Sequence, residues 1–263
     1  MRFIGQTKKL SEKFSKMKIK ILQWNIWYKE DPVKISNEIL RFSPDIACLQ
    51  ELRQNLGSGV DFEKTISEIT KYNHFYKEAV TWDNRPDVTS QGNAILSKFP
   101  VNTSRSEFIR PFRHNPENAT KEGRVYLETD INIGTNTLTV GTIHMPYAYK
   151  FRNSKIRRQE ADKLCGVLSR HPTNFIFTGD LNSIPNSFTV KSILTKTNLR
   201  NAGPDFDQKT WTTKPFNYHG FSENNLNWRI DYTFVSKDIK VVSSEIVDTD
   251  LSDHLPILTV IEV

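Results

Sequence analysis

Short apolar segments that end on a polar side chain recur along the whole chain, and this feature constrains the fold most. Their length, about 4–8 residues, is typical of buried strands and is far below the roughly 20 apolar residues of a transmembrane helix. We expect strands at residues 19–24, 45–50, 93–96, 125–133, 137–144, 175–178, 231–235, 241–247 and 255–263, and helices at 33–42, 61–72 and 155–168. Several strands are joined by hairpins. The pattern predicts an α/β (α+β) fold of two mostly antiparallel sheets packed face to face, with outer helices.

The net charge of +6 is concentrated at the N-terminus of the 263-residue chain. Residues 1–20 carry seven Lys and Arg against one acid, which leaves 29 basic and 29 acidic residues elsewhere. We therefore divide the chain into a basic N-terminal arm or helix at residues 1–17 and one large domain at residues 18–263. For the arm, the open alternatives are nucleic-acid or membrane-surface binding, a packing helix or loose tail, and a mitochondrial presequence.

The two cysteines, Cys48 and Cys165, stand in apolar surroundings, which indicates buried free thiols in a reducing compartment. No early apolar run ends in a cleavage signal, so secretion is not expected. The predicted location is the cytoplasm, or the nucleus of a eukaryote, and the predicted state is a monomer without membrane insertion.

Polar side chains suited to phosphate chemistry stand where the predicted strands end or begin. They are Asn25, Glu51, His144, Asp180, Asn182, Asp231, Asp253 and His254. If the strand ends gather on one edge of the sandwich, these groups meet, because loops at the end of a rigid scaffold commonly carry function. Each motif alone is a common turn or helix cap, and only their ordered combination supports a site.

The predicted site is rich in carboxylate and carboxamide oxygens and contains two histidines but no cysteine. Hard oxygen ligands favour Mg²⁺, with Mn²⁺ as a substitute, whereas zinc would need more His or Cys. We expect Glu51, helped by Asn25 and Asp253, to hold the ion. A metal there would neutralise a non-bridging phosphate oxygen and the leaving oxygen.

The segment Gly179-Asp-Leu-Asn182 places Asp180 and Asn182 on one side of an extended chain. Asp180 is expected to orient and deprotonate a water molecule, and Asn182 to hold that water or a phosphate oxygen.

The segment Ser252-Asp-His254 supplies an imidazole that, as a cation, would donate to developing negative charge. Asp231 is the candidate carboxylate partner that orients His254. His144 is expected to be a second charge stabiliser or the acid for the leaving group.

The ordered motifs resemble those of the endonuclease/exonuclease/phosphatase superfamily across residues 19–263. They are Gln23-Trp-Asn25, Leu49-Gln-Glu51, Gly92-Asn-Ala-Ile-Leu-Ser97, His144, Gly179-Asp-Leu-Asn182, Trp228-Arg-Ile-Asp231-Tyr and Leu251-Ser-Asp-His254. The resemblance implies a four-layered α/β sandwich with a metal site at the edge of two sheets. It implies metal binding by Asn25, Glu51 and Asp253. It also implies that Asp180 and Asn182 position the attacking water, and that Asp231 and His254 form an Asp–His pair.

The residue at position 144 separates branches of this superfamily. Abasic-site endonucleases similar to exonuclease III generally have a tyrosine where this chain has His144. The histidine is more similar to deoxyribonuclease I, the tyrosyl-DNA phosphodiesterases, the mRNA deadenylases and the sphingomyelinases. Ser183 after Asn182 also differs from the aromatic residue that usually follows this element in inositol phosphatases.

Basic and aromatic side chains near His144 and in the loop at 211–228 are candidates for substrate binding. They are Tyr147, Lys150, Arg152, Trp211 and Trp228. The resemblance adds Arg124, which matches a strand that often carries a basic residue in such enzymes, with a surface strand arginine as the alternative. Cations can follow a phosphate backbone and rings can stack on bases, although a solvated helix start and a packed flap remain alternatives.

Together these residues predict a Mg²⁺-dependent nuclease or DNA-end phosphodiesterase that hydrolyses P–O bonds by in-line attack of water. DNA is the expected partner ahead of RNA. The alternative is a phosphodiesterase or phosphatase for a small molecule or a lipid headgroup. A catalytically silent binding protein is disfavoured because every expected polar position is filled.

Overall fold

The computed structural model describes residues 17–83 and 85–263, and most of this chain lies in two large sheets and the helices beside them. The first sheet contains β1 (Lys18–Asn25), β2 (Ile46–Asn55), β3 (Val60–Asp61), β4 (Asn73–Thr81), β5 (Ser90–Ser97), β7 (Arg113–His114), β15 (Lys240–Ile246) and β16 (Ile257–Glu262). The second contains β6 (Val101–Arg110), β8 (Arg124–Ile133), β9 (Asn136–His144), β10 (Phe175–Asp180), β11 (Leu199–Asn201) and β14 (Asp231–Ser236). A separate hairpin joins β12 (Phe216–Tyr218) and β13 (Phe221–Glu223).

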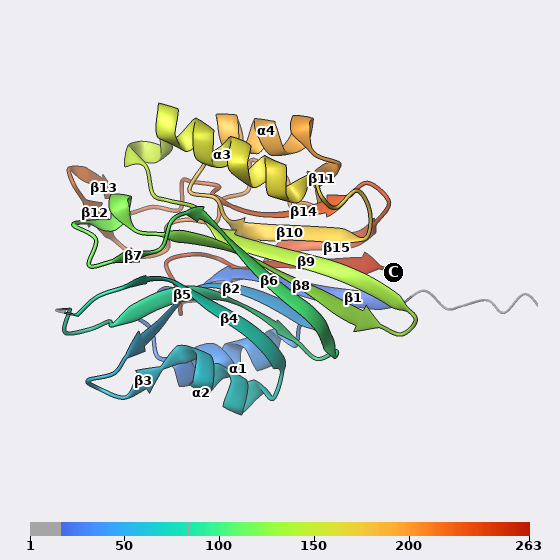
Figure 1. Cartoon of the computed structure of the whole chain (residues 1–263), viewed down its shortest axis with the longest axis horizontal. Coiled ribbons are helices and arrows are strands. Elements are labelled where there is room, and N and C mark those ends of the chain that lie inside the picture. Colours follow the sequence, from blue (N-terminus) through green and yellow to red (C-terminus); the bar gives the residue numbers. More distant parts are fainter. Residues whose placement is uncertain (1–16, 84) are drawn as a thin grey trace, which may run out of the picture.

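The helices are α1 (Pro32–Phe42), α2 (Phe62–Thr70), α3 (Lys155–Leu168) and α4 (Phe188–Lys196), with short 3₁₀ turns η1 (Ala119–Lys121) and η2 (Tyr149–Phe151). The first sheet has the order β15-β16-β1-β2-β5-β4-β7, with β3 paired to β2, and the second the order β11-β14-β10-β9-β8-β6. Figure 1 shows α1 and α2 outside the first sheet and α3 and α4 outside the second. The predicted sandwich of two mostly antiparallel sheets with outer helices is confirmed.

Strand β1 shows how the sequence divides its side chains between two layers. Ile19 and Ile21 point into the core between the sheets, whereas Leu22 and Trp24 pack in the core shared with α1 and α2. Successive residues of a strand face opposite sides, so a strand with helices on one face and a sheet on the other is buried on both. The same alternation places Asn25 on the face between the sheets, at the strand end.

The helix beside β1 begins and ends at residues suited to these positions. The Asp31 side chain accepts hydrogen bonds from the backbone N–H groups of Val33 and Lys34, and Pro32 occupies the first helical position. Ser43 ends α1 in the left-handed conformation. In the described residues, no helix is both long and apolar enough to span a bilayer.

Among the longer elements, β4, β6 and α4 were not predicted, and neither were the short strands β3, β7, β11, β12 and β13. Strand β6 is largely exposed at the sheet edge and contains few apolar residues, so it lacks the signal of a buried strand. Cys48 and Cys165 are free and buried, as expected. The predicted basic arm lies outside the described residues, apart from Met17.

Candidate active site

The strands that meet at the site become more polar toward one end of the space between the sheets. Apolar side chains such as Ile21 and Ile176 are followed by Gln23, Gln50, Thr142 and Thr178, all fully buried. We call these four residues the polar layer. On β1, β9 and β10 the next inward-facing position, two residues further on, carries Asn25, His144 and Asp180.

Hydrogen bonds in the polar layer join the two sheets. Gln23 and Gln50 each donate to the other through their side-chain amides, at 2.6 and 3.0 Å. Gln50 Nε2 also donates to Thr142 Oγ1 at 2.9 Å, and Thr178 Oγ1 lies 3.1 Å from the same oxygen. Since each buried polar group here has a partner, the layer fixes how the strand ends of the two sheets face one another.

A β-bulge turns Glu51 toward the site. The strand predicted to end at residue 50 continues through Asn55, and its pairing with β5 shifts between Leu49 and Leu52. Two residues of β2, Gln50 and Glu51, therefore lie opposite a single residue of β5, Asn93. Glu51 has a φ of 66°. Without the bulge, alternation would direct Glu51 toward the helices rather than into the space between the sheets. The predicted strand end at residue 50 was wrong, and the structure places Glu51 in the site by a bulge rather than by a strand end.

Strand pairing in the second sheet places three predicted catalytic residues in one row. Asp180 pairs with His144 across the parallel β9–β10 ladder and with Asp231 across the antiparallel β10–β14 ladder. Residues paired across a sheet lie side by side, so pairing alone brings these groups together. Asn25 extends the row to the first sheet, because its Nδ2 donates to Asp180 Oδ2 and to Glu51 Oε1, both at 3.1 Å.

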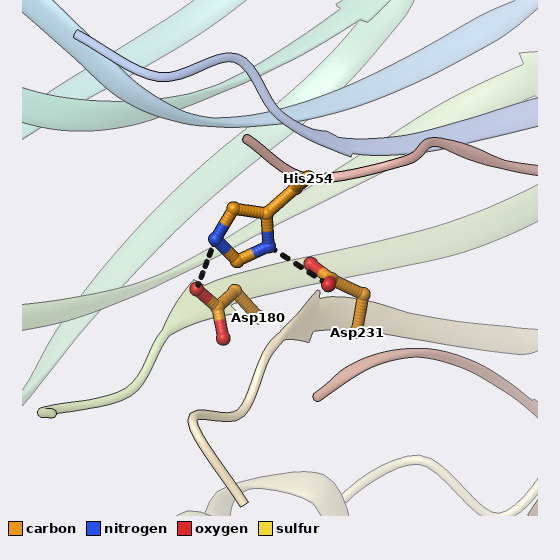
Figure 2. Close-up of side chains that lie close together, drawn as sticks. All are labelled: Asp180, Asp231 and His254. Atoms are coloured by element: carbon orange, nitrogen blue, oxygen red, sulfur yellow. Dashed lines mark hydrogen bonds and ion pairs between the residues drawn. The ribbon is translucent and has the colours of Figure 1, made fainter. Parts of the chain in front are cut away.

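His254 lies between two carboxylates, as Figure 2 shows. Its Nδ1 is 2.9 Å from Asp231 Oδ2, and its Nε2 is 3.8 Å from Asp180 Oδ2. Burial alone would lower the pKa of His254, but Asp231, Asp253 and Asp180 raise it to about 10. The imidazole is therefore a cation at neutral pH, and Asp231 is the partner expected from the sequence.

Asp180 has the properties of a general base. Its side chain is almost completely buried, and burial is the main reason that its pKa is raised to about 7. Within that value, the charge of His254 lowers the pKa and the charge of Asp231 raises it. A base works best when its pKa lies near the working pH. The carboxylate is also oriented, since its Oδ1 accepts a hydrogen bond from the backbone N–H of Asn182 at 2.8 Å.

His144 differs from His254 in its charge. Burial lowers its pKa well below the ordinary value, and the charges of Arg124, His254 and Arg157 lower it further. The ring is therefore neutral at neutral pH. Its Nε2 lies 3.0 Å from Asn182 Nδ2. If His144 Nε2 accepts a hydrogen bond from the Asn182 amide, the proton of the ring is on Nδ1, which faces Glu51 Oε1 at 3.9 Å. A neutral ring in this geometry favours a positioning role for His144 over the two expected roles, a second charge stabiliser or the acid for the leaving group.

Glu51 and Asp253 fit a divalent cation. Burial raises the pKa of Glu51, the nearby Asp253 carboxylate raises it further, and burial raises the pKa of Asp253 as well. Asp253 Oδ1 is buried without a hydrogen-bond partner among the described residues, while its Oδ2 accepts from Trp211 Nε1 at 3.1 Å. Two carboxylates whose ionisation is made costly by burial, and in Glu51 also by the Asp253 charge, suit a hard cation as counter-charge. In the observed rotamer, Asn25 directs its amide nitrogen to Glu51 while its oxygen accepts from the backbone N–H of Trp27.

The grouping of Asp180, Asp231 and His254, whose ligand atoms lie within 4.8 Å of one another, also satisfies simple metal-site geometry. The protonated imidazole, however, already supplies the positive charge there. Glu51 and Asp253 therefore stay the predicted metal ligands.

The eight residues predicted from strand ends, which we call the catalytic floor, are Asn25, Glu51, His144, Asp180, Asn182, Asp231, Asp253 and His254. Six of them line a cavity of about 580 Å³; Asn25 and Asp231 support it through the contacts described above. The volume lies within the range of small-molecule sites, about 300–1,000 Å³.

The predicted substrate-binding residues divide into two groups. Arg124, Tyr147 and Trp211 line the cavity. Lys150 and Arg152 are exposed beside the Tyr149 ring, outside the cavity lining. Trp228 belongs to an aromatic cluster, and its ring centroid lies 4.9 Å from that of Phe151. Its Nε1–H donates a hydrogen bond to Glu223.

The cavity lining also contains residues that were not predicted. Five of them contact one another through cation–π pairs and form what we call the cation–aromatic wall: Trp27, Tyr28, Lys29, Trp82 and Arg85. Part of this wall could have been predicted from the sequence, because two aromatic residues and a lysine follow Asn25 closely. The contribution of Trp82 and Arg85 depends on the fold, which brings the end of β4 to the same cavity.

Comparison with known proteins identifies the relatives of this arrangement. The sequence profile described as the endonuclease/exonuclease/phosphatase family matches residues 22–254. No curated protein sequence matches the chain significantly.

Three solved structures illustrate the shared fold. An endonuclease/exonuclease/phosphatase from Beutenbergia cavernae has a TM-score of 0.72 and 18% identity over 94% of this chain and 72% of that chain. D. rerio TDP2, complexed with a single-strand DNA product, has a TM-score of 0.67 and 17% identity over 94% and 99% of the two chains. A mannosyl-6-phosphatase from Bacteroides thetaiotaomicron has a TM-score of 0.66 and 16% identity over 92% and 99%.

Proposed function

Since the chain belongs to the endonuclease/exonuclease/phosphatase family of phosphoric-ester hydrolases, we propose that it is a Mg²⁺-dependent phosphodiesterase acting on nucleic acid. The reaction is in-line attack of water on phosphorus at the catalytic floor. Glu51 and Asp253, with Asn25 beside them, would hold the ion. When bound, Mg²⁺ supplies neutralisation of charge on a non-bridging phosphate oxygen and on the leaving oxygen.

The remaining residues have separate tasks in this mechanism. Asp180 accepts the proton of the attacking water, and Asn182 orients that water or a phosphate oxygen. His254, held as a cation by Asp231, donates a hydrogen bond to the negative charge that develops on phosphate. His144 keeps Asn182 in place through the contact at 3.0 Å.

One observation carries the proposal: at the cavity floor, a base with a pKa of about 7 lies 3.8 Å from an imidazole that is charged at neutral pH. Phosphoryl transfer needs a positioned base and a fixed positive charge more than it needs an unusual nucleophile. The arrangement of Asp231, His254 and Asp180 supplies both.

The preference for nucleic acid is supported by the cavity lining and by one relative. The lining combines aromatic rings with Lys29, Arg85 and Arg124. Rings that stack on bases and cations that bind phosphates are the usual components of a single-strand site. D. rerio TDP2, which shares the fold, is a protein complexed with single-strand DNA product.

A metal-dependent assay on a panel of substrates tests the proposal. Single-stranded, duplex, abasic and tyrosyl-linked oligonucleotides are compared with bis-p-nitrophenyl phosphate, with Mg²⁺ and with a chelator. We expect at least one oligonucleotide to be cleaved only with the metal. If bis-p-nitrophenyl phosphate is hydrolysed and no oligonucleotide is, the nucleic-acid substrate is wrong and the phosphodiesterase activity stands.

The second candidate is hydrolysis of a small-molecule or lipid-headgroup phosphoester. It is favoured by the likeness of the fold to a mannosyl-6-phosphatase and by a cavity of small-molecule size. Activity on these esters that exceeds oligonucleotide cleavage would support it. The monomeric state, the cytoplasmic or nuclear location and a separate basic arm at residues 1–17 stay predictions.

A further inference from the structure

Two cations stand on the cation–aromatic wall, each beside aromatic rings. Lys29 Nζ lies 5.3 Å from the Trp27 ring centroid and 5.7 Å from that of Tyr28. Arg85 Cζ lies 4.6 Å from the Trp82 ring and 5.9 Å from the Tyr28 ring. The ring quadrupole attracts a cation over its face, so these contacts order both charges at the cavity.

Neither cation is neutralised in a close ion pair. Within residues 17–83 and 85–263, no carboxylate forms an ion pair with Lys29. Arg85 meets Asp87 at 3.5 Å, where both side chains are substantially exposed, and such pairs contribute little. Both charges are therefore available to an anion in the cavity.

The wall is attached to the proposed metal site. The backbone N–H of Trp27 donates to Asn25 Oδ1 at 3.2 Å, and that of Tyr28 donates to Glu51 Oε2 at 3.3 Å. Lys29 follows in the same short segment. The two cations thus lie next to the residues that would receive the phosphate being hydrolysed, but they are not among those residues.

The catalytic floor makes this placement useful. The floor contains four carboxylates, Glu51, Asp180, Asp231 and Asp253, the last three buried, which repel any anionic group of a substrate other than the phosphate held by the proposed cation and His254. Positive charge on the adjacent wall offsets this repulsion for a substrate that carries a further anionic group there.

We propose that the cation–aromatic wall binds a second phosphate of the substrate, next to the phosphate that is hydrolysed. The inference rests on the proposed function and names its substrate class: an ester with at least two neighbouring phosphates. A polynucleotide supplies this chemistry, and so does a sugar polyphosphate. A substrate with one phosphate leaves the wall without an anion.

Binding measurements on an inactive protein test the proposal independently of catalysis. Isothermal titration calorimetry on Asp180→Asn protein with Mg²⁺ compares the dinucleotides TpT, pTpT and TpTp, and separately inositol 4-phosphate with inositol 4,5-bisphosphate, whose phosphates are on adjacent carbons. We expect one added phosphate to tighten binding by about tenfold, the size of a hydrogen-bonded charge contact. Gain confined to the dinucleotides identifies a polynucleotide, and gain confined to the inositol pair identifies a sugar polyphosphate.

Substitutions on the wall assign the gain to its cations. Lys29→Ala and Arg85→Ala, added to the Asp180→Asn protein, should each remove most of the gain, and the pair should remove it all. Lys191→Ala, an exposed lysine on the distant helix α4, removes the same charge and should change nothing.

Equal binding of the singly and doubly phosphorylated ligands would overturn the proposal, as would a gain that persists in the double wall variant. Both results leave the proposed function untouched. Conversely, if the wild-type protein shows no metal-dependent hydrolysis of bis-p-nitrophenyl phosphate, the proposed function is wrong. The binding constants measured on the Asp180→Asn protein do not depend on that result.

Discussion

The catalytic floor and the cation–aromatic wall line the same cavity but are built in different ways. The floor residues lie at or just beyond strand ends, at the bulge in β2 or on the segment before β16, and all are buried except Glu51, whose side chain is 16% exposed. The wall lies on two loops, one after β1 and one after β4, with Lys29 exposed and Arg85 partly so. Reaction chemistry is thus fixed by sheet pairing, and contacts to the rest of the substrate by loops.

This difference has an energetic cause. A base and a cation that act on one phosphate must hold their geometry closely, and the buried strand pairs and the polar layer provide rigidity. Contacts to a flanking group tolerate more movement, so partly exposed side chains suffice. Substitutions in the floor should therefore affect turnover, and substitutions in the wall should affect substrate preference.

Asp180→Asn should have the largest effect, because it removes the base and keeps the size of the side chain. We expect kcat for bis-p-nitrophenyl phosphate to fall by about 10²–10⁴-fold. Asp130→Asn is the matched control: its carboxylate accepts from Thr139 toward the opposite end of β8. Near-normal turnover by Asp180→Asn would mean that Asp180 is not the general base.

The pH dependence of kcat/KM should report the two groups that face each other in the floor. The active form needs Asp180 ionised, so kcat/KM should rise with pH up to about 7 and fall about tenfold per unit below it. It also needs His254 protonated, so a decline is expected near pH 10. A profile that is flat between pH 5 and 8 would contradict the assignment of Asp180.

Glu51→Gln should weaken metal binding while leaving the shape of the side chain. The Mg²⁺ concentration for half-maximal activity should rise at least about tenfold. Glu68→Gln, on the exposed face of α2, serves as a control with the same charge change. An unchanged Mg²⁺ titration would mean that the ion binds elsewhere in the cavity.

Thr142→Val should destabilise the protein by removing the hydroxyl that joins the two sheets in the polar layer. Gln50 and Thr178 would lose a buried partner, which costs about 1–3 kcal/mol of unfolding free energy in a urea titration. Thr142→Ser keeps the hydroxyl and should therefore retain most of this unfolding free energy. Equal stability of Thr142→Val and wild type would show that the layer does not join the sheets as described.

Substitutions in the wall should have the smallest effect on the chemistry itself. Lys29→Ala and Arg85→Ala are expected to keep kcat for bis-p-nitrophenyl phosphate within about twofold, the range of most surface changes. A loss as large as that of Asp180→Asn would abolish the distinction between floor and wall.

The same division explains what the sequence could predict. Asn25, His144 and Asp180 follow apolar strands, and strand ends of neighbouring strands meet, so their association followed from local patterns. The direction of Glu51 did not, because it depends on a bulge that appears only in the pairing of β2 with β5.

The protonation of the two histidines and the composition of the wall also required the structure. His144 and His254 are chemically identical in the sequence, and their opposite pKa shifts arise from the charges that the fold places around each ring. Arg85 reaches the cavity beside Lys29 although more than fifty positions separate them, so no local pattern links the two.

In the proposed mechanism, the floor directs water to phosphorus with the help of a divalent cation. Hydrolysis of bis-p-nitrophenyl phosphate in ¹⁸O-labelled water with Mg²⁺, followed by mass spectrometry of both products, shows which atom the water attacks. We expect one ¹⁸O atom in p-nitrophenyl phosphate and none in p-nitrophenol, with no turnover after chelation. Label in p-nitrophenol, or turnover that persists without the metal, would contradict this mechanism.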